Sequence, residues 1–285
     1  MSTGRFKNKV VVVTGAASGL GLASAQRLSS EGANVIAIDI NAQAVKDAVK
    51  SLPVKGLALT ADISSESDVE RYMADGVAEF GRIDYYHLNA GIFGSFAALP
   101  DLTIEDFDKV MNVNLRGTFL GLRAAFRQFD IQQTPGNIAV TASIASLTGS
   151  ADLLPYQTSK HGVVGLIHGA AMYGGPLGIR VNGVAPGIVP TELFAAASTT
   201  TGGKNDMEKR ASTTPLRRAG AASEIAGVVA FLLSEDSSYM AGQVVSADGG
   251  ATIVNTVRPS GGAGAWSTED VDRLVYKNST VKGLK

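Results

Sequence analysis

The most restrictive feature of this sequence is a block of four valines, Val10–Val13, that runs into the glycine-rich segment Thr14–Gly21. An unbroken run of β-branched residues predicts a strand that is buried on both faces. The segment after it, Leu20–Ser30, has the pattern of a helix that ends before Gly32. A buried strand, a glycine turn and a helix in this order predict the first part of a β-α-β unit, and therefore a parallel sheet.

The same alternation of short apolar runs and longer helical patterns continues along the chain. Further strands are predicted at Asn34–Ile40, Gly56–Ile63, Ile83–Asn89, Asn137–Ala142, Ile179–Ala185 and Gln243–Asp248. Helices are predicted at Ala42–Leu52, from about Ser65, at Thr103–Phe129 with a break near Gly117, at Pro155–Tyr173 and at Ser223–Ser234. Together these elements predict an α/β fold, a single doubly wound domain with a seven-stranded parallel sheet and helices on both faces. Ligands of such sheets bind outside the carboxyl ends of the strands.

Two segments depart from this alternation. Residues 188–215, rich in Ala, Ser, Thr and Gly, follow a strand end inside the domain 1–253 and predict a substrate lid. A surface loop without function is the alternative. Residues 254–285 form a C-terminal extension with a glycine-rich link and the only tryptophan, Trp266. Docking on the same subunit, docking on a partner, and disorder of its last residues all stay open.

Composition excludes several classes of protein. The chain has 0 cysteines, so it holds no disulfide and no thiolate site, which fits the reducing cytoplasm. Its 25 Lys and Arg against 26 Asp and Glu include no basic run, so we expect no nucleic-acid partner. With 3 histidines we expect no metal site. No stretch approaches the ~20 apolar residues of a membrane helix, and no signal-peptide pattern opens the chain.

The glycine-rich loop has the pattern of a dinucleotide site. A loop between a strand and a helix brings backbone N–H groups and the positive end of the helix dipole to a pyrophosphate. Gly15 permits the tight turn, Gly19 avoids a Cβ where a cofactor passes, and Gly21 lets the helix pack closely on the sheet. The loop alone is weak evidence, but the strand before it and the helix after it strengthen the prediction.

Asp39, at the end of the second predicted strand, decides between the two nicotinamide cofactors. A carboxylate there accepts hydrogen bonds from ribose hydroxyls and repels a 2′-phosphate. The neighbouring Ala16, Ala17, Ile40 and Asn41 supply no cation for that phosphate. We therefore predict NAD(H) rather than NADP(H). Asp39 could also cap the following helix, and the two roles are compatible.

Tyr156 and Lys160 are spaced i, i+4 and share one face of a predicted helix. A phenol with a pKa of about 10 is a poor base at neutral pH, but a nearby ammonium lowers that pKa. The pair therefore predicts a general acid/base, although a Tyr-x-x-x-Lys surface pair also arises by chance. Ser143, at the end of the fifth predicted strand, could hold a substrate oxygen beside the tyrosine. Asn114, within a helical pattern, indicates a kink, a water site or a tolerated polar residue.

In their combination and order these residues resemble the short-chain dehydrogenase/reductase family of the Tyr-x-x-x-Lys type. The resemblance extends from Lys9 to about Gly250 and implies a Rossmann-like fold. Its markers are Thr14-Gly15-x-x-x-Gly19-x-Gly21, Asp62, Asn89-Ala90-Gly91, Asn114, Ser143, Tyr156, Lys160, Pro186-Gly187 and Thr191. Pro155 before the tyrosine, the stretch Gly174–Leu177 and the long tail depart from the usual pattern, which leaves pocket closure and oligomer contacts open.

The resemblance implies a role for each matching residue. Asp62 and Ile63 would contact the adenine, and Asn89 and Gly91 the adenosine ribose. Lys160 would also hold the nicotinamide ribose, and Asn114 would anchor a water that relays protons to it. Pro186, Gly187, Ile188 and Thr191 would flank the nicotinamide and its phosphate. The expected cofactor site is completed by Ser18, Leu20, Ile40, Ala90 and Val189.

The expected reaction is the NAD-dependent interconversion of a secondary alcohol and a ketone. Tyr156 would exchange the proton while Ser143 helps to stabilise charge on the substrate oxygen. The candidate substrate wall is apolar and predicts an aromatic or cyclic substrate: Phe93, Ile144, Leu153, Leu154, Val189 and Phe194. Core packing is the alternative for each. No Arg or Lys obviously faces this wall, which disfavours acidic or phosphorylated substrates. An enoyl reductase, an epimerase and a catalytically idle NAD-binding regulator are the other functions considered.

By the same resemblance we expect a homotetramer or homodimer. The helices near Asn114–Phe129 and Pro155–Tyr173 would form the main contact. The glycines Gly162, Gly165 and Gly169 would allow close approach of two subunits, although packing within one chain explains them equally well.

Overall fold

The structure is a computed structural model that describes residues 4–150, 153–197 and 207–254. Two predictions from the sequence fall partly outside this range. They are the middle of the expected lid, residues 198–206, and the C-terminal extension beyond residue 254, including Trp266.

One parallel sheet of seven strands organises the molecule, in the order β3-β2-β1-β4-β5-β6-β7. Its strands are β1 (Val10–Thr14), β2 (Asn34–Asp39), β3 (Gly56–Thr60), β4 (Tyr85–Leu88), β5 (Asn137–Thr141), β6 (Arg180–Pro186) and β7 (Val244–Ala247). The predicted α/β fold is confirmed. The order of the strands reverses between β1 and β4, which makes this the point where a crevice opens in doubly wound sheets.

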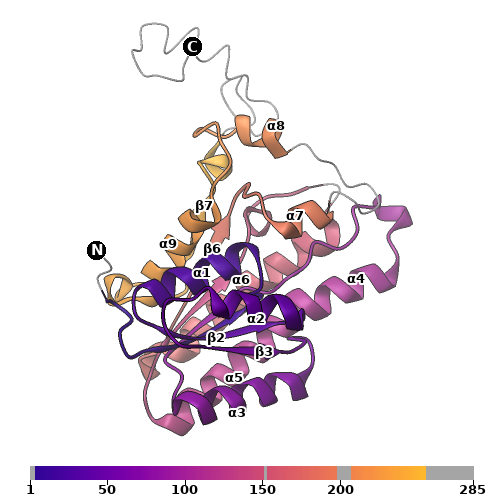
Figure 1. The fold of residues 1–285 in the computed structure, drawn as a ribbon. Coiled ribbons are helices and arrows are strands. Elements are labelled where there is room, and N and C mark those ends of the chain that lie inside the picture. Colours follow the sequence, from indigo (N-terminus) through magenta and orange to yellow (C-terminus); the bar gives the residue numbers. More distant parts are fainter. Residues whose placement is uncertain (1–3, 151–152, 198–206, 255–285) are drawn as a thin grey trace, which may run out of the picture.

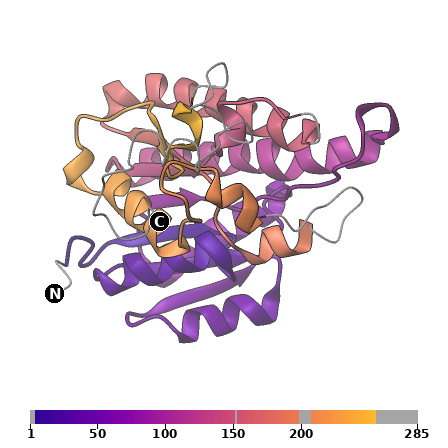
Figure 2. The same ribbon diagram turned by 90° about the horizontal axis from the view of Figure 1, so that it is seen from above.

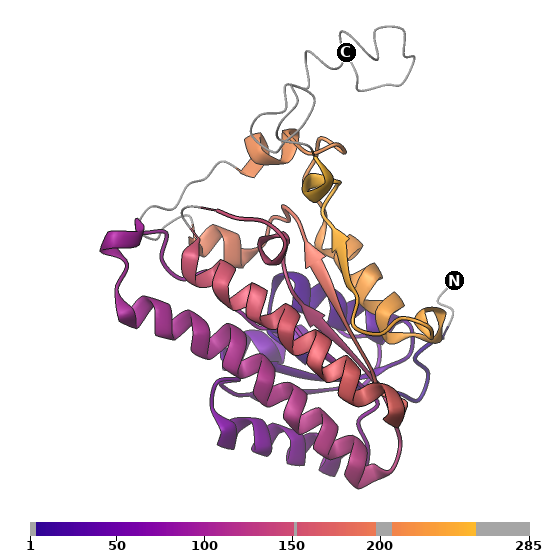
Figure 3. The ribbon, with the colours of Figure 1, turned by 180° about the vertical axis from the view of Figure 1, so that it is seen from behind.

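The four valines of β1 explain why both faces of the sheet are covered. Val10 and Val12 pack into one apolar core, and Val11 and Val13 pack into the other, because successive side chains of a strand point to opposite faces. Helices α3 (Glu66–Phe80), α5 (Gly117–Gln132) and α6 (Leu154–Gly174) cover the first face, shown in Figure 3. Helices α1 (Gly19–Ser30), α2 (Ala42–Lys50) and α9 (Ala222–Leu233) cover the second, shown in Figure 1.

The predicted break in the Thr103–Phe129 helix is a π-helical turn. Helix α4 (Ile104–Val110) continues into the π-helix η2 (Met111–Arg116) and then into α5. Asn114 lies within η2 and is buried, and its backbone carbonyl accepts a 2.7 Å hydrogen bond from the Thr118 hydroxyl. Asn114 thus lies in an irregular turn of the helix, and a kink or a water site there stays a prediction.

Two short helices lie where the sequence predicted an irregular lid. They are α7 (Glu192–Ala197) and α8 (Met207–Ser212), each of 6 residues, which is too short for a helical pattern to stand out in the sequence. Both lie above the carboxyl edge of the sheet in Figure 1, and Figure 2 views the molecule from that side. Whether they act as a lid stays a prediction.

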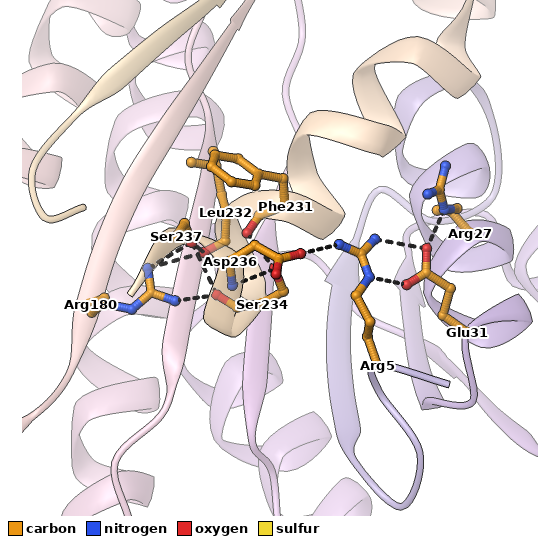
Figure 4. A network of polar contacts seen from close by, with 9 residues as sticks. All are labelled: Arg5, Arg27, Glu31, Arg180, Phe231, Leu232, Ser234, Asp236 and Ser237. Atoms are coloured by element: carbon orange, nitrogen blue, oxygen red, sulfur yellow. Dashed lines mark hydrogen bonds and ion pairs between the residues drawn. The ribbon is translucent and has the colours of Figure 1, made fainter. Parts of the chain in front are cut away.

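At the amino-terminal ends of the strands, two arginines join separate segments of the chain (Figure 4). Arg180, at the start of β6, donates hydrogen bonds to the carbonyls of Ser234 at 2.8 Å and Leu232 at 3.3 Å, at the end of α9. Arg5 forms ion pairs with Glu31 at 2.6 Å and Asp236 at 3.0 Å. These contacts anchor the N-terminal segment and the end of α9 far from the crevice. None of the described helices is both long and apolar enough to cross a membrane.

Candidate active site

A cavity of about 970 Å³ opens at the carboxyl edge of the sheet, on the segments that follow the strands. Most of the predicted cofactor residues line it: Gly15, Ser18, Gly19, Leu20, Asp39, Ile40, Asp62, Ile63, Asn89, Ala90, Gly91, Tyr156, Lys160, Pro186, Gly187, Ile188, Val189 and Thr191. Ser143 lines it as well. The structure therefore brings residues from the whole length of the domain to one place.

The glycine-rich loop has the backbone that the sequence predicted. Gly15 adopts a left-handed φ of 66°, which only glycine adopts without strain. Gly21 lies outside the cavity lining, and a Cβ there would come within 1.9 Å of the Gly15 carbonyl oxygen, so its part is close packing of α1 on β1. The side chain of the N-cap residue Ser18 makes no capping hydrogen bond. The first N–H groups of α1 are thus not capped by this side chain, and helix N-termini of this kind bind anions.

The carboxylate of Asp39 braces this loop. Its two oxygens accept hydrogen bonds from the backbone N–H of Ala17 at 3.1 Å and of Asn41 at 3.0 Å. Asp39 does not cap the next helix, because the N-cap of α2 is Asn41, whose side chain accepts from the backbone N–H of Ala44. A negative charge is therefore held at the cavity wall beside the glycine turn.

Asn89 joins the segment after β4 to the end of β1. Its backbone N–H donates to the Thr14 hydroxyl at 2.9 Å, and its side-chain amide donates to the Thr14 carbonyl at 3.0 Å. In the segment after β3, the Asp62 carboxylate accepts hydrogen bonds from the backbone N–H of Ser64 at 2.8 Å and from its hydroxyl at 2.7 Å. These bonds hold open the part of the cavity where the sequence predicts the adenosine half of the cofactor.

Ser143, Tyr156 and Lys160 converge on the cavity and are almost fully buried. Ser143 follows β5, and its hydroxyl accepts a 3.1 Å hydrogen bond from the backbone N–H of Ala145. Tyr156 and Lys160 lie one turn apart on α6, which begins with Pro155 in its first turn, as the sequence predicted. The Nζ atom of Lys160 lies 5.7 Å from the centroid of the Tyr156 ring and donates a 2.7 Å hydrogen bond to the carbonyl of Thr141.

Burial dominates the protonation of this pair. It raises the pKa of Tyr156 to about 12, while a hydrogen bond with Ser143 acts in the opposite direction. It lowers the pKa of Lys160 to about 8. The predicted lowering of the tyrosine pKa by the lysine is therefore not seen in this structure, because desolvation disfavours both charged groups. The phenol keeps its proton at neutral pH, which is the state of a general acid.

Asn114 lies behind the cavity rather than in its lining. Its amide nitrogen donates to the carbonyl of Ile92 at 2.8 Å and to the hydroxyl of Ser159 at 3.0 Å. Its amide oxygen accepts from the backbone N–H of Ile92 at 2.8 Å. The side chain thus ties the segment after β4 to α6, and the water relay expected from the family resemblance stays a prediction.

A row of buried, hydrogen-bonded polar side chains at the end of β5 was not predicted from the sequence. The Thr141 hydroxyl donates to the Asn89 side-chain oxygen at 3.0 Å and lies 2.9 Å from His87 Nε2. Because its single proton is given to Asn89, the Nε2 of His87 must carry the hydrogen and donate to Thr141. Burial lowers the pKa of His87 to about 3, so the ring is neutral. Two polar residues within otherwise apolar strands were the signal that could have shown this row.

The expected apolar wall is an aromatic cluster. The centroid of the Phe93 ring lies 4.4 Å from that of Tyr156, 5.7 Å from that of Phe194 and 6.0 Å from that of Phe96. Phe96 was not among the residues predicted from the sequence. Ile144, Leu153 and Val189 line the same cavity. Leu154 does not, because it starts α6 with its side chain exposed.

Charged side chains also reach this cavity. Lys109 and Arg210 line it, so the expectation that no cation faces the substrate wall is wrong. The sequence could not show this, because Arg210 comes to the wall from α8 through tertiary packing. Within the described part of the chain no three metal-ligating side chains cluster.

Comparison with known proteins identifies relatives over nearly the whole domain. A family model described as Enoyl-(Acyl carrier protein) reductase matches residues 15–252. Levodione reductase from Leifsonia aquatica is 40% identical over 256 residues, covering 87% of this chain and 96% of that protein. Cyclohexanol dehydrogenase from Acinetobacter sp. strain SE19 is 35% identical over 251 residues, covering 87% and 96%.

Solved structures agree with these matches. The crystal structure of a levodione reductase superimposes with a TM-score of 0.83 at 37% identity, covering 88% of this chain and 100% of that one. That of NAD+-bound xylitol dehydrogenase gives a TM-score of 0.79 at 35% identity, covering 86% and 99%. With the cavity, the glycine loop and the Ser-Tyr-Lys set in place, these matches show that the chain belongs to the short-chain dehydrogenase/reductase family.

Proposed function

We propose that this protein is an NAD(H)-dependent dehydrogenase that interconverts a secondary alcohol and its ketone, with a cyclic or aromatic group on the substrate. The observation that carries the proposal is the convergence of Ser143, Tyr156 and Lys160 on one cavity that also holds the aromatic cluster around Phe93. The names of two relatives, levodione reductase and cyclohexanol dehydrogenase, support oxidation and reduction at a CH–OH group.

The residues present fit a dinucleotide. Gly15 and Gly19 line the cavity beside the first N–H groups of α1, which would bind a pyrophosphate, and Asp39 offers a carboxylate to a ribose diol and repulsion to a 2′-phosphate. The NAD+ bound by xylitol dehydrogenase supports the same choice of cofactor. When bound, the nicotinamide exchanges hydride with the carbinol carbon of the substrate.

The protein's own groups handle the proton and the charge on oxygen. Tyr156 gives its phenolic proton to the substrate oxygen during reduction and takes it back during oxidation. Ser143 stabilises charge on the same oxygen by hydrogen bonding. Lys160 holds a positive charge beside the phenolate that forms, and it binds the nicotinamide ribose. Asn114 supports Lys160 through a water relay. We also propose a cytoplasmic location, because the chain has 0 cysteines.

Absorbance of NADH tests the reaction directly. The purified enzyme is expected to oxidise cyclic and aryl secondary alcohols with NAD+ and to reduce their ketones with NADH. A cyclic enone belongs in the same assay, because loss of its C=C bond with retention of the carbonyl would identify an enoyl reductase instead. Cofactor binding without turnover of any of these compounds would indicate the idle regulator.

We further propose that two or four copies associate through α5 and α6. An apolar groove of about 510 Å³ between these helices is lined by Leu115, Phe119, Gly165 and Leu166, among others. Gly162 packs against Leu115 of its own chain, whereas a Cβ on Gly165 or Gly169 would meet no described atom within 4 Å. Packing within the chain therefore explains the first glycine and not the other two. Light scattering on the purified protein tests this, with a monomer as the contrary result.

A further inference from the structure

Arg210 brings a guanidinium into the aromatic end of the cavity. Its Cζ atom lies 5.8 Å from the centroid of the Phe194 ring. The Phe194 ring in turn packs edge-on against Phe93, with centroids 5.7 Å apart, and the Phe93 ring packs at a tilt against Tyr156, with centroids 4.4 Å apart. The cation is thus joined to the acid/base through two rings, on the wall where the non-reacting part of a substrate would lie.

No described carboxylate uses the hydrogen-bond donors of this guanidinium. Among the described residues, no acidic side chain lies within ion-pair distance of Arg210. Glu192 lines the same cavity, but its carboxylate lies beside the glycine-rich loop: one of its oxygens is 3.5 Å from the point where a Cβ on Gly19 would lie. The cation–π contact with Phe194 does not use the N–H groups as hydrogen-bond donors, which leaves them for another partner.

We propose that Arg210 binds a second oxygen of the substrate, at a distance from the carbonyl that reacts at Ser143 and Tyr156. The inference rests on the proposed function and narrows its substrate class to cyclic compounds with two oxygen functions. These are dicarbonyl compounds and keto acids, together with the corresponding hydroxy compounds. Carbonyl and carboxylate oxygens share the acceptor chemistry that a guanidinium recognises.

This arrangement makes Arg210 a specificity residue rather than a general binding group. The remaining wall residues, such as Phe93, Phe96 and Leu153, bind any ring of suitable size without regard to its substituents. Arg210 is exposed, so a ring with a single carbonyl leaves its guanidinium to water, whereas a second substrate oxygen replaces that water as the acceptor. Because water competes for an exposed guanidinium, we expect this hydrogen bond to change kcat/KM by about tenfold, the lower end of the range for charged donors.

Three cyclic ketones separate the possibilities in NADH-dependent reduction. They are cyclohexanone with one oxygen, cyclohexane-1,4-dione with a second carbonyl and 4-oxocyclohexanecarboxylate with a carboxylate. The wild-type enzyme is expected to favour one of the two-oxygen compounds over cyclohexanone by about tenfold or more in kcat/KM. Which of the two is favoured shows whether the acceptor is neutral or charged.

The variants assign this preference to the side chain. Arg210→Met and Arg210→Gln are expected to lower the ratio at least tenfold, mainly through KM. Lys209→Met is the matched control, because Lys209 is the exposed neighbour on α8 outside the cavity lining, and it should keep the wild-type ratio. Unchanged thermal melting shows that the variants are folded.

The outcomes distinguish the two proposals. Reduction of all three ketones at similar kcat/KM, or a preference that survives in both Arg210 variants, overturns the inference and leaves the proposed function intact. A wild-type enzyme that binds NADH but turns over none of these ketones, and none of the cyclic and aryl alcohols of the first assay, overturns both.

Discussion

The ammonium group of Lys160 donates a 2.7 Å hydrogen bond to the backbone carbonyl of Thr141, and both residues are buried. Thr141 is the last residue of β5, and Lys160 lies one helical turn after Tyr156 on α6. The bond therefore joins the acid/base helix to the strand end that carries Ser143. The ammonium of Lys160 therefore lies where water cannot solvate its charge.

Removing the Lys160 amine is expected to stabilise the protein at neutral pH. Burial lowers the pKa from 10.5 to about 8, so between these values the folded state binds fewer protons than the unfolded state. The contribution of Lys160 to wild-type stability should therefore rise with pH from about 8 to 10.5 and be flat below 8. The free energy of unfolding of the Lys160→Met variant at pH 7 should be about 1–3 kcal/mol higher than that of the wild type, and its rise with pH above 8 should be lost. Urea unfolding between pH 6 and 10.5 measures both, and an equal slope in the two proteins would contradict the buried charge.

Replacing Tyr156 by phenylalanine is expected to remove catalysis and spare cofactor binding. The substitution deletes the hydroxyl but keeps the ring that stacks on Phe93. We expect kcat to fall about 10²–10⁴-fold, the usual contribution of a general acid/base, with the Kd for NADH unchanged. Tyr173→Phe, an exposed position on the same helix, is the control and should behave as wild type. Steady-state rates and NADH fluorescence titration measure the two effects, and a Tyr156→Phe enzyme with near wild-type kcat would refute the assignment.

Two variants of Asp39 separate its charge from its hydrogen bonds. Asp39→Asn removes the charge and keeps an acceptor oxygen for one of the N–H groups of Ala17 and Asn41. It should raise kcat/KM with NADP(H) at least tenfold relative to NAD(H), because a 2′-phosphate is no longer repelled. Asp39→Ala loses both hydrogen bonds to these N–H groups and should weaken the binding of both NAD(H) and NADP(H). A wild-type preference for NADP(H), measured in the same assay, would show that the charge has no such role.

The hydroxyl of Thr141 is expected to be coupled energetically to His87. Thr141→Val keeps the shape but leaves the Nε2–H of His87 and the side-chain oxygen of Asn89 without their shared partner. We expect a loss of about 2–3 kcal/mol in the free energy of unfolding. In a His87→Leu background only Asn89 loses a partner, so the same change should cost about 1 kcal/mol less. Urea denaturation of the four proteins gives the coupling, and strict additivity would rule it out.

Arg180 is expected to stabilise the domain from the edge opposite the cavity. Its guanidinium, half-buried, holds the carbonyls of Ser234 and Leu232 at the end of α9, where a cation also complements the helix dipole. Arg180→Met should lower the free energy of unfolding by about 2–3 kcal/mol. Arg218→Met removes an exposed ion pair with Glu224 and should cost much less, because water screens exposed charges. Chemical denaturation compares the two, and equal losses would mean that the Arg180 contacts contribute no more than a surface pair.

The fold was predictable because its signals are local. The valine run of β1 specifies a strand buried on both faces, and the glycines at 15 and 21 specify a turn and a close packing that no other residue permits. The spacing of Tyr156 and Lys160 likewise specifies one helix face. Each of these patterns acts over a few residues of chain, so the sequence alone determined the sheet, the glycine loop and the positions of the candidate catalytic residues.

What the sequence could not determine depends on residues that are far apart in the chain. The protonation of Tyr156 and Lys160 is set by how completely other segments exclude water from them, which a spacing rule does not measure. The chain of hydrogen bonds through His87, Thr141 and Asn89 requires two strands to lie side by side. Arg210 reaches the cavity only because α8 packs above the sheet. Only the tertiary structure decided these features, because burial and long-range contacts are properties of the packed chain as a whole.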